Sequence, residues 1–290
     1  MTRNAHARRY SRCSISANEG LMSPESMVVV LLAAAFDHDC LFCRDKKRRS
    51  FGVLDFKFSW MVIGALLTIC LADGPASGQS TILNVPSTET MSRNELYVEA
   101  DLIAHASSFK KGGFVWYGPS VIYGMGRNVE IGVNAYVMKE AGPASFEIQP
   151  NVKWKVFDDE SKGVSAAAGV LMFLPLKHWN ETGAAAMFYA VVGKKVNKKF
   201  GPRFTTGAYG LAGRREWTKS RAGPMLGYEQ PLGRRLTFMA DWYCGRNQMG
   251  YGAAGFGLTM TKNSTLYATY NIGNEGRGNN WLGIYYGFVF

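Results

Sequence analysis

His105 lies among residue types that could carry out hydrolysis. It follows Asp101 by four positions and precedes Ser107 and Ser108, so a carboxylate, a base and a hydroxyl occur together. Such a set performs acyl transfer when the carboxylate orients the imidazole and the imidazole takes the serine proton. The same residue types are common in polar loops, and no nucleophile motif surrounds either serine. We expect no enzyme, and a hydrolase that uses His105 is the alternative.

The cysteines give no metal or redox site. Cys40 and Cys43 form one CxxC pair, without the second pair or the histidines that a zinc site requires. Beyond residue 79 the chain has Cys244 alone, which cannot form an internal disulfide. We expect neither a metal nor a cofactor.

Charged side chains often recur two positions apart, as Glu99 with Asp101 and Lys153 with Lys155. In a strand this spacing places both side chains on one face. Such a face could line a hydrophilic path with charge selectivity, or its charges could pair, notably Glu130 with Lys153 or Lys155, and plug the interior. The candidates for this lining are Glu95, Glu99, Asp101, Glu130, Glu147, Lys153, Lys155, Arg221, Glu229 and Asp241.

The elements that must position these residues alternate with a period of two. From Phe146 to Val156 every second residue is apolar, except for one proline, and the intervening residues are polar. This period separates two faces of a strand and scatters the same residues around a helix. Segments of this kind begin near residues 94, 113, 128, 144, 163, 183, 203, 221, 234, 250, 264 and 279.

Two of these twelve segments, 163–174 and 184–192, are rich in alanine and apolar on both faces. Their composition alone also permits helices. Gly163, Gly169, Gly183 and Gly193 favour strands, because glycine weakens a helix interior.

The connections form two groups. Three turns near residues 127, 233 and 263 are tight, and longer ones follow residues 158 and 197. The alternate connections, 105–112, 139–144, 177–182, 214–220, 245–250 and 273–279, are mostly longer. Short periplasmic turns and longer outer loops characterise outer-membrane barrels. Both ends of the strand array are then periplasmic.

A soluble β-sandwich also alternates, but the two faces favour a membrane barrel. Tyrosine, glycine and charged residues share one face, which suits a wet lumen opposite a lipid-facing band. Tyr and Trp near segment ends suit interfacial girdles. A mean hydropathy of −0.10 does not oppose this, because barrel strands alternate between lipid and lumen. The predicted fold is all-β, an antiparallel up-and-down transmembrane β-barrel of about 12 strands.

The segment 279–290 carries the most specific pattern. An apolar residue occupies every second position up to an aromatic residue, in the series Leu282, Ile284, Tyr286, Phe288 and Phe290. This resembles the C-terminal assembly signal of bacterial outer-membrane β-barrel proteins. The resemblance covers about residues 80–290 and concerns the class. It implies outer-membrane lipid and the barrel assembly machinery as partners.

The residues before the barrel resemble an export segment. Residues 46–79 combine basic residues at 46–49, an apolar core over 60–72 and small residues after it, the order of a Sec-type signal peptide. Residues 1–45 would be a poorly structured extension, disordered or helical. Translation that starts later, for example at Val53, would remove them.

Charge and size limit the function. Ten of the 33 basic and seven of the 22 acidic residues precede residue 79, which leaves a net charge of +8 beyond it. These charges are scattered and form no compact basic run, so we expect no nucleic-acid binding. We predict an outer-membrane protein with a narrow passive channel for small hydrophilic solutes, preferentially anionic ones. A plugged structural or adhesive barrel is the alternative.

Overall fold

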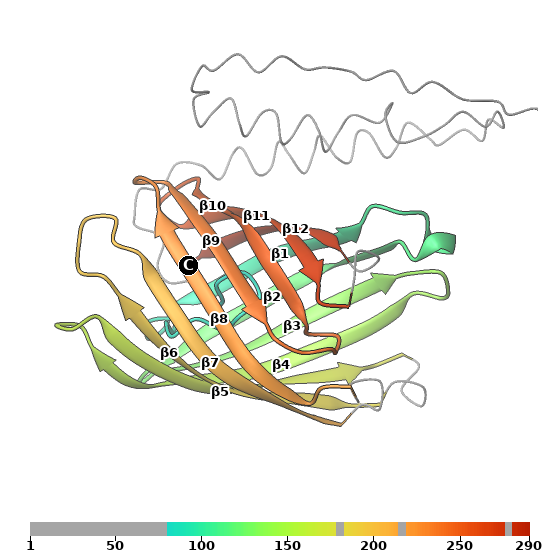
Figure 1. The fold of residues 1–290 in the computed structure, drawn as a ribbon, viewed down its shortest axis with the longest axis horizontal. Helices are drawn as coiled ribbons and strands as arrows, with labels where there is room; N and C mark the ends of the chain where they lie inside the picture. Colours follow the sequence, from blue (N-terminus) through green and yellow to red (C-terminus); the bar gives the residue numbers. More distant parts are fainter. Residues whose placement is uncertain (1–79, 178–182, 214–218, 276–279) are drawn as a thin grey trace, which may run out of the picture. The chain divides into compact units, whose positions relative to one another are not determined.

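The computed structural model describes residues 80–177, 183–213, 219–275 and 280–290. In these residues twelve antiparallel strands each pair with their neighbours in sequence, and β1 pairs with β12, which closes the sheet into a barrel (Figure 1). The strands are β1 (Leu96–His105), β2 (Phe114–Gly126), β3 (Val129–Lys139), β4 (Ser145–Asp159), β5 (Val164–Pro175), β6 (Ala185–Lys195), β7 (Arg203–Gly213), β8 (Ala222–Pro231), β9 (Leu236–Tyr243), β10 (Tyr251–Thr259), β11 (Ser264–Gly273) and β12 (Trp281–Val289).

The predicted fold class and the twelve alternating segments are confirmed. The two alanine-rich segments are β5 and β6, which pair along their whole length. Their small inner residues, such as the buried Ala167 and Ala185, fit a crowded interior. Pairing with neighbouring strands therefore outweighs the intrinsic helix propensity of the alanines in β5 and β6.

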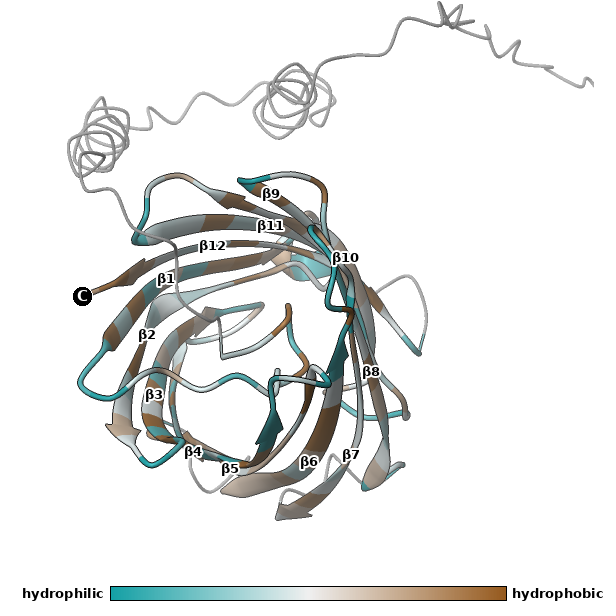
Figure 2. Cartoon of the chain, turned by 90° about the vertical axis from the view of Figure 1, so that its left-hand side faces the viewer, coloured by the Kyte–Doolittle hydropathy of each residue, from teal (hydrophilic) through white to brown (hydrophobic). Residues whose placement is uncertain are grey.

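Hydropathy alternates along the strands (Figure 2), and the burial of the side chains alternates as well, which separates an inner from an outer face. On β12, for example, Trp281, Gly283 and Tyr285 are buried, whereas Leu282 and Ile284 between them are exposed. The outer face thus presents large apolar side chains to the surroundings. An apolar exterior around a closed sheet suits lipid, because closure leaves no unpaired strand edge.

A ladder of aromatic rings crosses four strands on the outer face. Phe204, Tyr228, Phe238 and Phe256 follow one another from β7 to β10, with ring centroids 5.2, 6.4 and 5.5 Å apart. The first three of these residues lie near one rim of the barrel. Their position matches the aromatic girdle that marks a membrane interface in barrels of this kind.

The two rims of the barrel differ. At the turn end, where the described chain enters β1 and leaves β12, connections 127–128, 160–163, 232–235 and 260–263 are short, and 196–202 is longer. The opposite rim, the loop end, has the connections 106–113, 140–144, 176–184, 214–221, 244–250 and 274–280. The loop between β1 and β2 contains the 3-10 turn η1 (Phe109–Lys111). No helix among the described residues is long and apolar enough to cross a membrane.

Candidate functional site in the barrel lumen

A segment of the chain that precedes β1, residues 80–92, lies inside the barrel and is called the plug here (Figure 1, the blue-green chain within the barrel). Its first part is a tight hairpin, in which Thr81 bridges to Pro86 and the Ile82 amide donates to the Val85 carbonyl at 2.8 Å. Ile82, Val85 and Thr88 are completely buried. Because a hairpin this short has no core of its own, the barrel wall must supply its burial.

Asp241 on β9 holds the tip of this hairpin. Its Oδ2 atom accepts hydrogen bonds from the backbone amides of Leu83, Asn84 and Val85, at 3.0, 2.6 and 2.7 Å. The Asn84 side chain also donates to Oδ1 of Asn271 on β11 at 2.7 Å. Three successive amides on one carboxylate form an anion-binding nest. Asp241 is therefore the acceptor that fixes the position of the hairpin tip.

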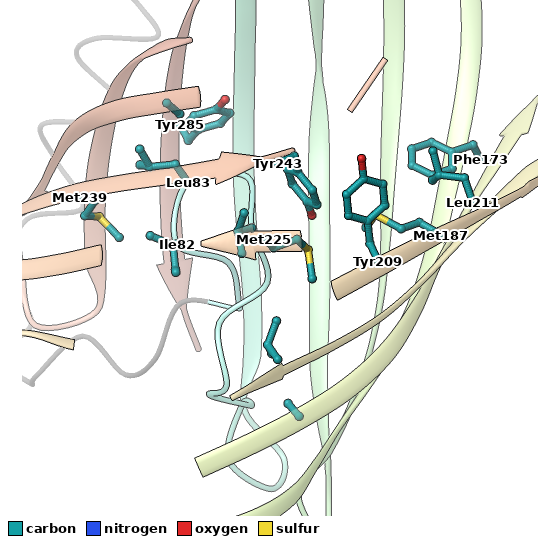
Figure 3. Close-up of a cluster of buried hydrophobic side chains, with 14 of the residues drawn as sticks. Ile82, Leu83, Phe173, Met187, Tyr209, Leu211, Met225, Met239, Tyr243 and Tyr285 are labelled. Atoms are coloured by element: carbon teal, nitrogen blue, oxygen red, sulfur yellow. The ribbon is translucent and has the colours of Figure 1, made fainter. Parts of the chain in front are cut away.

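Apolar contacts support the same tip (Figure 3). Ile82 and Leu83 belong to one buried cluster with Met225 of β8 and Met239 of β9. Gly227 on β8 makes room for Ile82, since a Cβ atom at Gly227 would lie 2.1 Å from the Ile82 Cδ1 atom. The inner face of the wall therefore contacts the plug through close apolar packing as well as through hydrogen bonds.

A buried ion pair binds both ends of the plug. Lys153 of β4 lies 3.0 Å from Glu130 of β3, and both side chains are at most 1% exposed. The Lys153 ammonium also donates to the carbonyl and hydroxyl of Ser80, at 2.7 and 2.9 Å. The other carboxylate oxygen of Glu130 accepts the Met91 amide at 2.8 Å. Glu130 thus pairs with Lys153 across the two strands, which is one of the two pairings considered from the sequence. The same two residues also hold the plug at Ser80 and Met91.

Glu89 makes the third polar attachment. It lies 2.9 Å from Lys155 of β4 and 2.9 Å from Arg203 of β7. Burial raises the pKa of Glu89, but the positive charges of Arg203 and Lys155 outweigh it and hold the pKa below the usual value. Glu89 is thus ionised at neutral pH and joins two strands that are not neighbours in the barrel.

The last part of the plug fits against the wall at close range. Thr88 and Ser165 of β5 share a hydrogen bond of 2.6 Å. Near the turn end, a Cβ atom at Gly124 of β2 would lie 1.8 Å from the carbonyl oxygen of Ser92. Asn94, with a φ of 65°, then donates its amide to the Gly124 carbonyl at 2.9 Å as the chain turns into β1. A side chain at Gly124 would therefore prevent this close approach.

Two cavities lie on opposite sides of the plug. The turn-end cavity, of about 640 Å³, is lined by charged residues of both signs, including Glu89, Lys155, Arg203 and Glu229. The loop-end cavity, of about 260 Å³, has the hairpin as one boundary and is lined mainly by aromatic and amide side chains. The plug thus separates the two halves of the lumen.

The predicted lining residues occupy different parts of this arrangement. Glu130, Lys153, Lys155 and Asp241 contact the plug, as described above. Glu99 and Asp101 line the loop-end cavity, and Glu229 lines the turn-end cavity. Glu147 is buried on β4 and accepts a hydrogen bond from Gln149 at 2.8 Å.

Two of the predicted lining residues fall outside the strands. Glu95 precedes β1, and its carboxylate accepts the amide of Ser92 at 3.0 Å. Arg221 precedes β8 at the loop end and is exposed. The sequence analysis placed the start of this segment near residue 221, one residue before the observed start of β8. Arg221 therefore lies at the rim, before the strand.

His105 and Asp101 do not come together. His105 lies near the end of β1, where its Nδ1 atom contacts the Asn280 carbonyl and its ring stacks on Phe114 at 5.8 Å. Four residues of a strand span about 13 Å. Asp101 instead accepts hydrogen bonds from Ser120 at 2.8 Å and from Tyr136 at 2.6 Å. A catalytic base oriented by this carboxylate is not assembled here.

The sequence reasoning missed the plug itself. Ile82, Leu83 and Val85 form a short apolar stretch that has no neighbouring alternating segment to pair with. An apolar run too short for a barrel strand, between the predicted signal peptide and the first alternating segment, was the available signal. The predicted signal peptide and the extension before it, residues 1–79, lie outside the described residues.

The fold and the lumen together define the class, a transmembrane-type β-barrel with an internal plug. No family model matches the chain, and no curated protein matches its sequence. Solved outer-membrane barrels are similar in fold, among them a porin, a channel and a phospholipase.

The KdgM porin in complex with disordered oligogalacturonate is 6% identical, with a TM-score of 0.45 over 68% of this chain and 98% of that one. An outer membrane channel from Pseudomonas putida F1 is 12% identical, with a TM-score of 0.48 over 70% of this chain and 98% of its own. The outer membrane phospholipase A from Escherichia coli is 14% identical, with a TM-score of 0.41 over 68% and 89%. These similarities concern barrel architecture.

Proposed function

We propose that this chain is an integral outer-membrane barrel that conducts small hydrophilic solutes only when the plug leaves its seat. The observation that carries the proposal is the plug itself, which separates two cavities of one lumen. Lipid around the outer face and the barrel assembly machinery, acting on Leu282 to Phe290, are the partners this role requires.

The attachments of the plug suit a reversible closure. Asp241, Glu130 and Glu89 hold it through hydrogen bonds and ion pairs to three separate parts of the wall. Water can replace the wall groups in each of these contacts once the segment moves, because hydrogen bonds and ion pairs form and break reversibly.

Conductance of the purified full chain in planar bilayers tests the proposal. We expect the wild type to stay mostly closed and Asp241→Ala to open often, because three plug amides lose their acceptor. Glu160→Gln is the matched control, since Glu160 is exposed at the turn end. If folded Asp241→Ala conducts no more than the wild type, the protein is a permanently plugged structural or adhesive barrel.

We infer a non-enzymatic role, which the separation of His105 from Asp101 supports. A hydrolase would require another carboxylate or a rearranged β1. Hydrolysis of phospholipid and peptide substrates by the wild type, abolished in His105→Ala, would overturn this inference.

A further inference from the structure

The loop-end cavity has a composition that the channel role does not require. Tyrosine and tryptophan side chains from several strands line it, among them Tyr136, Tyr189, Tyr285 and Trp281. Small polar pores need few aromatic rings, whereas binding pockets combine such rings with a few well-placed polar groups. This part of the lumen is therefore built as a pocket.

The charge of this lining has one sign. Among the described residues around the cavity, the acidic side chains are Glu99 and Asp101, and the lining contains no lysine, arginine or histidine. The two carboxylates lie two positions apart on the inner face of β1, where they repel each other while both are ionised. A cation between them relieves that repulsion, and a neutral polyol does not. The local charge is thus opposite to the net charge of the chain.

One oxygen of Asp101 lacks a partner. Asp101 is only 5% exposed. Its Oδ2 atom accepts hydrogen bonds from the hydroxyl groups of Ser120 and Tyr136. Within the described residues, Oδ1 accepts no hydrogen bond. A buried acceptor without a donor is costly, and few occur in native proteins. A ligand with an N–H donor would satisfy this atom.

An aromatic ring faces the same position. Tyr285 on β12 is the direct cross-strand partner of Asp101, so both side chains lie on one face at short range. The Tyr285 ring lies close to Gly283, where a Cβ atom would be 2.4 Å from the tyrosine hydroxyl. A ring held beside a carboxylate provides the cation–π surface that ammonium groups prefer.

We propose that the loop-end cavity binds a small organic ammonium compound. Its N–H group donates to Oδ1 of Asp101, its charge lies between Glu99 and Asp101, and its hydrocarbon part packs on Tyr285 and the neighbouring rings. The cavity of about 260 Å³ limits the ligand to a few carbon atoms. The proposal requires only the folded barrel, and it is independent of whether the plug ever opens.

Titration of the full chain in detergent micelles with n-butylammonium tests the site, by calorimetry and by the fluorescence of Trp116 and Trp281, which line the cavity. We expect saturable binding at constant ionic strength. Butanol, which has a donor but no charge, should bind at least about tenfold more weakly, and tetramethylammonium, which lacks an N–H donor, should fall between them. Equal binding of butylammonium and butanol would overturn the proposal, as would binding of glucose without butylammonium.

Variants locate the binding. Asp101→Asn should weaken butylammonium binding by about tenfold, and Glu99→Gln by less, because Asp101 provides the unpartnered atom. Glu160→Gln removes one negative charge at the opposite rim and should leave binding unchanged. Heat-modifiable gel migration shows whether each variant keeps the barrel. If folded Asp101→Asn binds butylammonium as the wild type does, the site lies elsewhere and the proposal fails.

Discussion

The two halves of the lumen use charge in opposite ways. Around the plug, Glu130 with Lys153 and Glu89 with Lys155 and Arg203 are paired charges that hold one segment of chain. In the loop-end cavity, Glu99 and Asp101 have no basic partner among the described lining residues. Paired charges fix structure, whereas acidic groups without a basic partner in a cavity mark a candidate binding site. The proposed closure and the proposed ligand site therefore concern different depths of one barrel.

Removing one partner of the buried pair should have the largest effect. Lys153→Met leaves Glu130 buried without its cation, and we expect the free energy of unfolding to fall by about 3 to 5 kcal/mol. Unfolding in urea, with lipid vesicles present, measures this. The double variant Glu130→Gln with Lys153→Met should recover part of the loss.

The matched control for this prediction is Lys162→Met. Lys162 pairs with Asp159 at the turn end but is 75% exposed, so its loss should change the unfolding free energy little. If Lys153→Met and Lys162→Met lowered the free energy of unfolding equally, burial of the Glu130–Lys153 pair would not contribute to stability.

A methyl group against the plug should have the next largest effect. Gly124→Ala places its Cβ 1.8 Å from the Ser92 carbonyl, and backbone must move to relieve the overlap. We expect a loss of about 1 to 3 kcal/mol and faster proteolysis between residues 80 and 92. Gly210→Ala on β7 is the control, because nothing lies within 4 Å of the added atom. Equal protease resistance in both variants would contradict the described seat.

Acid should weaken the plug through Glu89. Because its pKa is lowered on folding, its pairing contributes fully above the ordinary value of 4.5 and is lost as the pH falls through the lower folded value. Lys155, Arg203 and Lys153 favour its ionised form, and Asp158 shares Lys155 with it. We expect channel opening to increase several-fold below about pH 4.

Glu89→Gln isolates the contribution of this residue to the acid response. This variant should open more than the wild type at neutral pH and respond less to acid. Identical pH profiles of bilayer conductance for wild type and Glu89→Gln would remove Glu89 from the mechanism.

The smallest effect on stability should come from the loop-end cavity. Asp101→Asn retains the acceptor for Ser120 and Tyr136 and removes one of two repelling charges. We expect the unfolding free energy to change by less than about 1 kcal/mol, although the variant binds butylammonium about tenfold more weakly. A loss as large as that of Lys153→Met would mean that Asp101 is structural and that the two halves do not differ.

The sequence allowed prediction of the barrel because alternation is a local property. Each strand shows its inner and outer faces in its own residues, so even the alanine-rich β5 was located to within one residue. The pairing of Glu130 with Lys153 was also foreseeable as one of two options, because β3 and β4 are joined by a short loop.

The plug could not be derived in this way because its contacts are distant in sequence. Nothing near Asp241 in the chain indicates that it binds amides of residues 83–85, and its charge was consistent with an open, wet lumen. Net charge was equally uninformative about recognition. The +8 of residues 79–290 suggested anionic solutes, whereas the lining of the loop-end cavity is acidic.

The position of the plug at the start of the described chain constrains the order of folding. Its tip amides meet Asp241 across 156 to 158 residues, and its seat combines β3, β4, β7 and β9. The hairpin emerges during synthesis before any of these strands, and its binding surface is complete only late. Contacts at such separations slow folding, because the loop entropy is lost before they form. The plug can therefore take its place only after strands far from it in sequence have come together, which makes its seating a late step of folding.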